Sequence, residues 1–567
     1  MLGISQAIRA KAGWREKLLH SPSTLAAWRA GALADGAALP SRKLPGVVTY
    51  HVNAAAVEHV LQELQWVAQG CGGLYPPGTA PGAVPGTFEG LPGLLPSATL
   101  AALQAGVAEL EKGPRDEHPF SKGLVRDLVH PSLYCAVLGV SRTGGGEVVG
   151  VPALVPVGQG EGGEAESVGG VGDFSERATG YLSTSHAWLP AEVAVDEAGA
   201  ATLVSSVNNL DPASPAGAAL YPALSQTLTA LLPLFEATLS EAASPAQPLH
   251  NNPWCTREHM PQVNYGDFDS VPQHLQDGPW LREREKEGHL SAYKDAHERA
   301  GVPTEERAWE DLRYDGSSDY PLDGPLALPA TPPFAPPLAR PASVALRGRT
   351  LQVIVRLASI ELTPAQPVYE GGQWHLEGMA NERIVASAVC YLDSANITPS
   401  ALAFRVPVQE PLEYPQNERA AVAAAFDVLD EEAGEGSACV QHLGSAATPQ
   451  GTVLAWPNTL QHRVQPFQLA DPAAPGHRKV LVLWLVDPTA RIASTGDVPA
   501  QQEGWGGVRL PRDAPDPPGG RATLTLGQAQ EHRLALMAER AAVKKVDAGE
   551  DAEGDSTFLR GVSLCEH

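Results

Sequence analysis

The sequence has 567 residues, of which 43% are hydrophobic and 19% are charged, so the chain can bury a sizeable core and is not a disordered protein. Its 40 basic and 65 acidic residues give a net charge of −25, which excludes nucleic-acid binding through a general basic field. The apolar stretches are short, as from Val480 to Val486, so no membrane span is expected. Six scattered cysteines without paired spacing predict reduced thiols in an intracellular, cytoplasmic protein, and the oligomeric state stays open.

The N-terminal part of the chain, residues 1–240, is predicted to be mostly helical. Met1 to Leu19 carries basic side chains without a long apolar run, which predicts an amphipathic helix rather than a signal peptide. Asn53 can cap a helix whose apolar residues share one face, and Ser97 can cap another. The stretch from Thr143 to Asp173 is rich in Gly and Glu and predicts a surface loop.

A small β-hairpin and a longer helix are expected next. Ala187–Val195 and Ala201–Val207 are strand-like runs, and an acidic turn that contains glycine separates them. Tyr221–Leu239 has a helical pattern that Pro233 is expected to kink or break. Residues 241–343 are polar and rich in proline, which predicts a solvated segment that connects the two halves of the chain.

Short strands are predicted for residues 344–510. The strand-like runs are Leu351–Leu362, Ile384–Tyr391, Ala401–Val406, Thr452–Trp456 and Lys479–Val486. Several short strands with turn signals between them are typical of an antiparallel sandwich or barrel. In the C-terminal tail, residues 511–567, Thr525 and Gln528 fit a capping box that opens a helix. The fold class is therefore predicted to be α+β, with a helical N-terminal region against a C-terminal β-barrel.

The clearest chemical signal is the run from Trp374 to Gly378, which contains His375 and Glu377. On a strand, residues i and i+2 project to the same face, so these two side chains are expected to point into one space. An imidazole and a carboxylate, joined by a distant second histidine, form the facial ligand set of non-heme Fe(II) oxygenases. A histidine and a glutamate at this spacing also occur as an ordinary surface or packing pair.

Two downstream residues support the metal-site interpretation. His462 follows a predicted strand and could supply the second imidazole. Arg478 opens the apolar strand that ends near Val486, and its guanidinium could bind the distal carboxylate of a 2-oxo acid through two hydrogen bonds. Arg356 shares a strand face with Gln352, where it would meet an anionic substrate or co-substrate, or else face solvent.

The order of His375, Glu377, His462 and Arg478 resembles that of the Fe(II)/2-oxoglutarate-dependent oxygenases. Most of those enzymes have Asp where this chain has Glu377, although their clavaminate-synthase-like branch also has Glu. A broader likeness extends over nearly the whole chain, to an oxygenase-like family of unknown function that is common in fungi and algae. The segments that carry this likeness are Asp127–Tyr134, Trp188–Glu192, Asn208–Leu210 and Leu564–His567.

This resemblance implies a fold, a cofactor and a reaction. The core, residues 344–510, would be a double-stranded β-helix, also called a jelly roll. His375, Glu377 and His462 would be the catalytic Fe(II) ligands, and Arg478 would bind 2-oxoglutarate as co-substrate. The retained Glu377 implies hydroxylation or desaturation, because related halogenases replace the metal carboxylate to make room for halide.

Alternatives to a 2-oxoglutarate-dependent oxygenase remain open at this point. The chain could be a catalytically lapsed oxygenase fold that serves as a binding or scaffold protein. It could also be a cupin-like dioxygenase or a zinc-binding hydrolase that uses no 2-oxo acid, although such a site would not need Arg478. The substrate could be a small molecule or a protein side chain, and the acidic composition favours a cationic one through long-range attraction.

Overall fold

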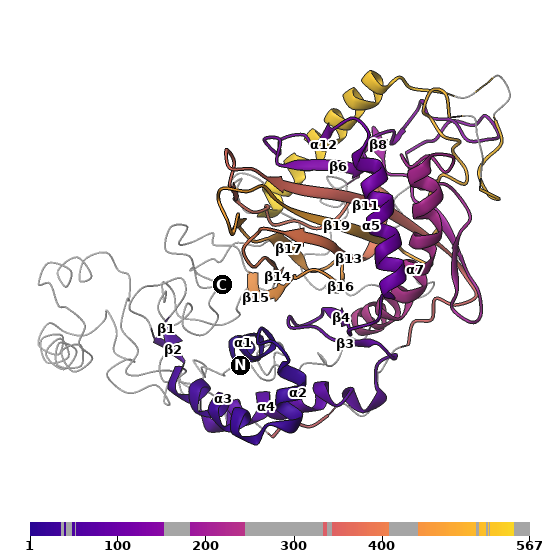
Figure 1. Ribbon diagram of the computed structural model, residues 1–567. Coiled ribbons are helices and arrows are strands. Elements are labelled where there is room, and N and C mark those ends of the chain that lie inside the picture. The colour runs from indigo at the N-terminus through magenta and orange to yellow at the C-terminus, as the bar shows by residue number, and fades with distance from the viewer. Residues whose placement is uncertain are drawn as a thin grey trace, which may run out of the picture.

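The computed structural model describes residues 1–35, 39–40, 48–50, 53–151, 182–243, 333–336, 343–407, 440–505, 510–516, 520 and 522–548. These residues form a mixed α/β fold with seven α-helices and extensive antiparallel sheets (Figure 1). Most of the loop predicted from Thr143 onward lies outside the described residues, as do most of segment 241–343 and the chain beyond residue 548. The division of the chain into four parts stays a prediction.

The first four helices form one end of the molecule in Figure 1. They are α1 (Leu2–Arg9), α2 (Trp14–His20), α3 (Pro22–Asp35) and α4 (Ala54–Ala68). The single helix predicted for Met1–Leu19 is wrong, because Gly13 has a left-handed backbone (φ 65°) between α1 and α2. The cap predicted for α4 is confirmed, since the Asn53 side chain accepts a hydrogen bond from the Ala56 amide at 2.8 Å.

Two long helices, α5 (Ser97–Glu111) and α7 (Pro215–Ala242), lie side by side in Figure 1. Ser97 is not the cap of α5, because Pro96 holds the N-cap position and Ser97 is the first helical residue. The break predicted at Pro233 is also wrong, since α7 continues through it. Burial of α7 against α5 and the sheet offsets the one backbone hydrogen bond that a proline cannot donate.

Helix α7 is also long and apolar enough to cross a membrane by length and composition, and 56% of its most apolar window is buried inside the fold. A helix at the core of a globular fold has the same composition, because it is surrounded by apolar partners. Within the described residues, no other helix passes this test. The burial of α7 against the sheet accounts for its composition without a membrane.

The large sheet has ten strands, eight of them in the order β10-β9-β11-β19-β13-β16-β4-β3, and β6 pairs with both β11 and β5. Their bounds are Thr79–Pro81 (β3), Phe88–Gly90 (β4), Asp116–Glu117 (β5), Val125–Val129 (β6), Ala191–Val195 (β9), Ala201–Leu203 (β10), Thr350–Leu362 (β11), Ile384–Ala395 (β13), Val453–Pro457 (β16) and Gly476–Val486 (β19). The predicted hairpin is confirmed as β9 and β10. Strands from both halves of the chain thus share one sheet.

A second, three-stranded sheet has the order β15-β14-β17. Its strands are Ala401–Pro407 (β14), Val440–Ala447 (β15) and Gln461–Val464 (β17), and shorter pairs are Leu39–Pro40 (β1) with Val48–Tyr50 (β2), Ala136–Val137 (β7) with His186–Ala187 (β8), and Val368–Tyr369 (β12) with Phe467–Gln468 (β18). Phe404 of β14 packs with Tyr391 of β13 and Trp456 of β16 in one buried cluster. The second sheet therefore covers part of one face of the large sheet.

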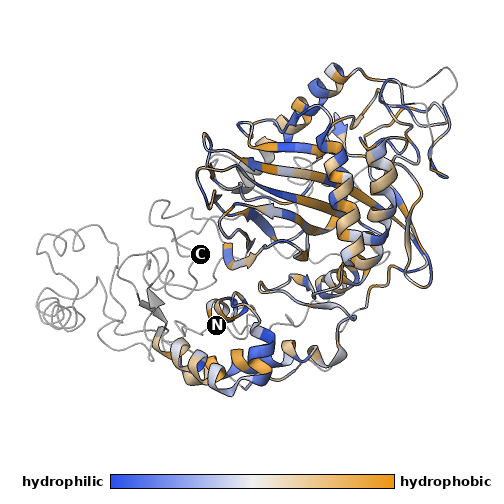
Figure 2. Ribbon diagram, in the orientation of Figure 1, coloured by the Kyte–Doolittle hydropathy of each residue, from blue (hydrophilic) through white to orange (hydrophobic). Residues whose placement is uncertain are grey.

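Successive side chains along a strand point to opposite faces of the sheet, so the two faces of the large sheet pack against different neighbours. On β19, Leu481, Leu483 and Leu485 pack in the main core with α5 and α7, whereas Val480 and Val482 face the second sheet. Figure 2 shows hydrophobic residues along the strands and along the two helices that lie against them. The candidate site residues lie on the face opposite α5 and α7.

The last described helix, α12 (Leu526–Ala548), packs on that same opposite face. Its Leu536 joins a buried cluster with Ile354 of β11 and Trp484 of β19. The predicted capping box is present, since Gln528 Oε1 accepts a hydrogen bond from the Thr525 amide at 3.0 Å, and the Gln528 amide donates to Thr525 Oγ1 at 3.3 Å. Helix α12 therefore begins at its predicted cap and packs against the large sheet on the side away from α5 and α7.

The contact between α5 and α7 depends on Gly106. A Cβ built there would lie 2.5 Å from two carbon atoms of Leu220, which is fully buried. We expect Gly106→Ala to lower the free energy of unfolding by about 1–3 kcal/mol, because overpacking outweighs the gain in helix propensity. Gly31→Ala in α3, where the new methyl group meets nothing within 4 Å, should be neutral or stabilising. Thermal melting of both variants tests this, and an unchanged melting temperature for Gly106→Ala would contradict the packing.

Candidate metal centre

Two imidazoles and one carboxylate converge on the face opposite α5 and α7. Glu377 Oε1 lies 3.2 Å from His462 Nε2 and 3.7 Å from His375 Nε2. The two rings are 4.4 Å apart between centroids. Ligand atoms that share one metal ion at right angles are separated by roughly 3 Å, as bond lengths near 2.1 Å require. The three side chains are thus spaced as ligands of a single ion.

Backbone pairing brings these distant residues together. The His375 amide donates to the His462 carbonyl at 3.2 Å, and the His462 amide donates to the His375 carbonyl at 3.1 Å. The prediction that His375 and Glu377 lie on a strand is wrong, because His375 forms only an isolated bridge with His462 and Glu377 lies in a bend. The two side chains still converge, because the bridge and neighbouring side chains set the path of this segment.

Asn458 and Gly378 hold the segment around Glu377. The Asn458 side chain accepts a hydrogen bond from the Glu377 amide and donates one to the Glu377 carbonyl, both at 2.9 Å. Gly378 has φ 73°, and a Cβ there would lie 2.8 Å from Ile384. Only glycine fits this turn without strain, so the turn fixes the direction of the Glu377 side chain.

Both histidines are held in the tautomer that suits metal binding. His375 Nδ1 lies 2.8 Å from the Gln373 carbonyl, and His462 Nδ1 lies 3.4 Å from the Leu460 carbonyl. A carbonyl can only accept, so each Nδ1 carries a proton and each Nε2 is directed toward Glu377. Metal-bound histidines are commonly oriented in this way, with the other nitrogen donating to a carbonyl or carboxylate.

The electrostatics of Glu377 also favour a cation. Burial alone would raise the pKa of its carboxyl group, but hydrogen bonds from His375 and His462, which carry a proton on Nε2 when no metal is bound, outweigh burial and hold that pKa well below its ordinary value. Glu377 is therefore ionised at neutral pH although it is almost completely buried. A divalent ion would replace these two Nε2 protons, and the buried carboxylate would supply a negative charge beside it.

The three residues are placed beside a cavity of about 1,130 Å³. His375 and Glu377 line it, together with Trp188 and Trp484 from the large-sheet side and Arg540 from α12. Arg356 of β11 lines the same cavity, so of the two predicted orientations it takes the one that faces the interior. A cavity of this size can hold a small organic molecule next to the three candidate ligands.

Arg478 is buried and does not line this cavity. Its side chain is buried, with Nη2 donating to Thr448 Oγ1 at 2.9 Å and the guanidinium 4.4 Å from the centre of the Tyr391 ring. Among the described residues, Nε and Nη1 have no hydrogen-bond partner. A buried guanidinium with two unpaired nitrogens is costly, so it is poised to bind an anion.

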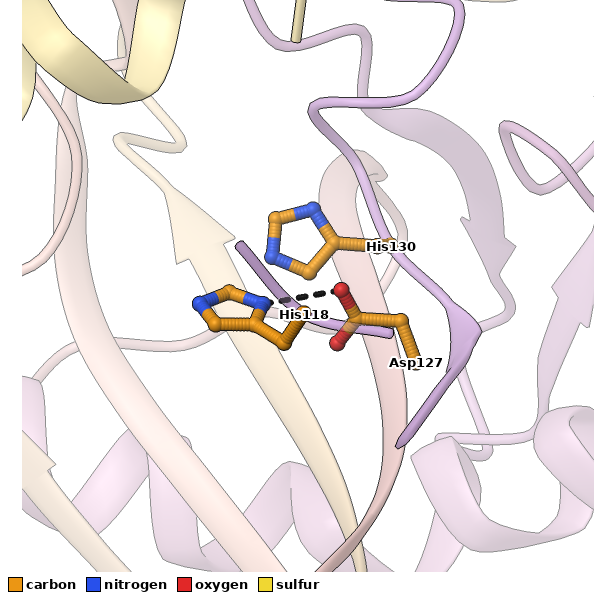
Figure 3. A group of neighbouring side chains, drawn as sticks. All are labelled: His118, Asp127 and His130. Carbon is orange, nitrogen blue, oxygen red and sulfur yellow. Dashed lines mark hydrogen bonds and ion pairs between the residues drawn. The ribbon is translucent and has the colours of Figure 1, made fainter. Parts of the chain in front are cut away.

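A second group of two histidines and an aspartate lies on the same cavity and was missed by sequence reasoning. His118 Nδ1 donates to Asp127 Oδ2 at 2.8 Å, and the His118 and His130 rings are 5.1 Å apart between centroids (Figure 3). His130 alone was considered, and only as a packed histidine. The available signal was Asp127 itself, an acidic residue inside the apolar strand β6.

Three features distinguish this second group from the first. The Ser132 amide donates to His130 Nδ1 at 3.1 Å, which puts the His130 proton on Nε2, where a metal would bind. Burial lowers the pKa of His130 well below its ordinary value, so the ring stays neutral. Arg356 Nη2 lies 3.3 Å from Asp127 Oδ1 and 3.4 Å from His118 Nδ1. A guanidinium already holds the place of a cation there, so the second group is less suited to a metal ion than the first.

Comparisons with known proteins give a family and weak structural likenesses. No curated protein matches the chain. Solved structures with local similarity include a BsmA homologue from Methylobium petroleophilum PM1 at 15% identity and TM-score 0.15, covering 24% of this chain and 42% of that one. They also include IDO from Bacillus thuringiensis at 8% identity and TM-score 0.16, covering 24% of this chain and 50% of that one.

A further solved structure with local similarity is the Fe(II)/(alpha)ketoglutarate-dependent dioxygenase TqaL, at 14% identity and TM-score 0.16, covering 27% of this chain and 52% of that one. The chain thus matches about half or less of each of these proteins. The family match is much longer, because residues 92–508 match the family described as "Protein of unknown function (DUF4246)". The chain therefore belongs to the DUF4246 family.

Proposed function

We propose that this protein is an Fe(II)- and 2-oxoglutarate-dependent oxygenase that hydroxylates or desaturates a small molecule or a protein side chain. The observation that carries the proposal is the convergence of His375, Glu377 and His462, with both imidazoles in the ligating tautomer. Two histidines and one carboxylate on one side of a ferrous ion leave open positions for a 2-oxo acid and dioxygen. Bound iron would supply the activation of dioxygen, and oxidation of a C–H bond would accompany decarboxylation of 2-oxoglutarate to succinate.

The proposed core is a double-stranded β-helix. Its two walls would be the β11-β19-β13-β16 part of the large sheet and the β15-β14-β17 sheet. The buried cluster of Tyr391, Phe404 and Trp456 would fill the space between the two walls. Trp456 also lies against His462, with ring centroids 4.9 Å apart, which would keep that ligand in place.

Different residues of the chain would bind the metal ion and the co-substrate. Glu377 would neutralise one of the two charges of the metal, and the Gln373 and Leu460 carbonyls would hold the imidazoles in register. Arg478 would bind the distal carboxylate of 2-oxoglutarate through Nε and Nη1, which have no hydrogen-bond partner among the described residues. The apolar rings around Arg478 would exclude water and strengthen that ion pair.

Removing either imidazole tests the metal ligands. We expect His375→Ala and His462→Ala to weaken Fe(II) binding by at least about 100-fold, since even residues that only orient metal ligands cost roughly 10–100-fold. Anaerobic equilibrium dialysis followed by metal analysis measures this directly. The control is His477→Ala, because His477 pairs with Asp393 at 2.7 Å and lies outside the site. Full iron occupancy in both histidine variants would refute the assignment.

Removing the guanidinium tests the co-substrate. We expect Arg478→Ala to weaken 2-oxoglutarate binding by roughly 10–100-fold, the value of a lost charge-assisted pair, with Fe(II) occupancy unchanged. Calorimetry on the Mn(II)-loaded protein gives the affinity, and Arg115→Ala is the control because Arg115 is an exposed partner of Glu117.

Succinate release separates the proposed activity from its alternatives. The wild-type protein with Fe(II) and 2-oxoglutarate should release succinate, and candidate substrates should increase the rate. A scaffold protein, a cupin-like dioxygenase or a zinc-dependent hydrolase would release none. Metal-dependent binding of 2-oxoglutarate without turnover would point to a missing substrate, whereas absence of both binding and release would contradict the proposed function.

A further inference from the structure

We propose that Arg356, held by Asp127, binds a carboxylate group of the substrate inside the large cavity. The inference rests on the proposed function, because it assigns this cavity to the molecule that is oxidised. It concerns a different group from Arg478, which is proposed to bind the co-substrate. The prediction from composition that a cationic substrate is favoured would then be wrong for the cavity itself.

The first argument is the position of Arg356. It lines the same cavity as His375 and Glu377, whereas Arg478 does not. A substrate anchored at Arg356 would therefore share one continuous space with the proposed metal ion. The cavity volume of about 1,130 Å³ is large enough for a drug-sized molecule that reaches from one group to the other.

The second argument is that Arg356 is held in place but only partly used. Its Nη2 donates to Asp127 Oδ1 at 3.3 Å, whereas His118 Nδ1, 3.4 Å from the same Nη2, donates to Asp127 and does not accept from Arg356. Nε is buried and has no hydrogen-bond partner among the described residues, and about a quarter of the side chain is exposed (24%). A fixed guanidinium with unused donors recognises a carboxylate at a low entropic cost.

The third argument is the charge balance around Arg356. Burial alone would raise the pKa of Asp127, but the hydrogen bond from His118 and the charge of Arg356 help to hold that pKa below its ordinary value, so Asp127 is ionised. One guanidinium and one carboxylate nearly cancel, and His130 adds a neutral Nε2–H donor rather than a charge. Such a site favours a monoanion such as a carboxylate over a phosphate dianion, which would be left with excess negative charge.

Tyr369 lies near both arginines. It lines the cavity and packs on Phe467 with ring centroids 5.2 Å apart, and Arg478 lies 5.7 Å from the centre of that same Phe467 ring. The charges of both Arg356 and Arg478 act on the Tyr369 hydroxyl and oppose the rise in its pKa that burial causes. Two cationic groups thus lie near this aromatic pair, which suits two separate carboxylates.

The test is binding of benzoate, and separately of inorganic phosphate, to the metal-free protein by calorimetry. We expect Arg356→Gln to weaken benzoate binding roughly 10-fold or more, as the loss of a charge-assisted hydrogen bond predicts. Arg356→Lys, which keeps the charge without the planar group, should fall between the wild type and Arg356→Gln. Arg383→Gln is the matched control, because it removes a positive charge from the same cavity where Arg383 is paired with Asp487.

The outcomes distinguish this inference from the proposed function. Unchanged benzoate binding in both Arg356 variants, or tighter binding of phosphate than of benzoate, would overturn it while leaving iron and 2-oxoglutarate binding untouched. Binding of 2-oxoglutarate to the Mn(II)-loaded protein should be unchanged in Arg356→Gln. If it is lost there and retained in Arg478→Ala, Arg356 binds the co-substrate and the inference is wrong.

Discussion

The pairing of residue 375 with residue 462 is the constraint on which the site depends. Two backbone hydrogen bonds join segments that are far apart in the sequence, and they place two imidazoles on either side of one carboxylate. The same segments supply the carbonyls that fix each imidazole tautomer. The geometry of the candidate metal centre is therefore a property of the backbone, and the large and second sheets hold that backbone in place.

Two groups, each of two histidines and one carboxylate, lie beside the cavity, and they differ in whether a cation already pairs with the carboxylate. In the first, two nitrogen atoms face a carboxylate with no cation among the described residues. In the second, Arg356 already pairs with Asp127, and the Ser132 amide gives His130 the wrong tautomer for a metal. The residue types alone do not distinguish the two groups, whereas the direction of their hydrogen bonds does.

Sequence reasoning found the main strands and the three converging side chains, because apolar runs such as Val480–Val486 and the spacing of His375 and Glu377 are local patterns. It placed Glu377 on a strand, although the chain turns at Gly378 and the Asn458 side chain holds the Glu377 backbone through hydrogen bonds. It missed the short strands β3 and β4 because three residues carry too little periodicity. It also missed the contact of Asp127 with Arg356, which a sheet pairing between distant strands creates.

The central claim is that one metal ion binds between His375, Glu377 and His462. Anomalous diffraction from crystals soaked anaerobically with Fe(II) tests it most directly. The account predicts a single iron peak within bonding distance of both Nε2 atoms and the Glu377 carboxylate. A peak at His118, Asp127 and His130 instead, or no peak at the first group in crystals with an ordered site, would contradict it.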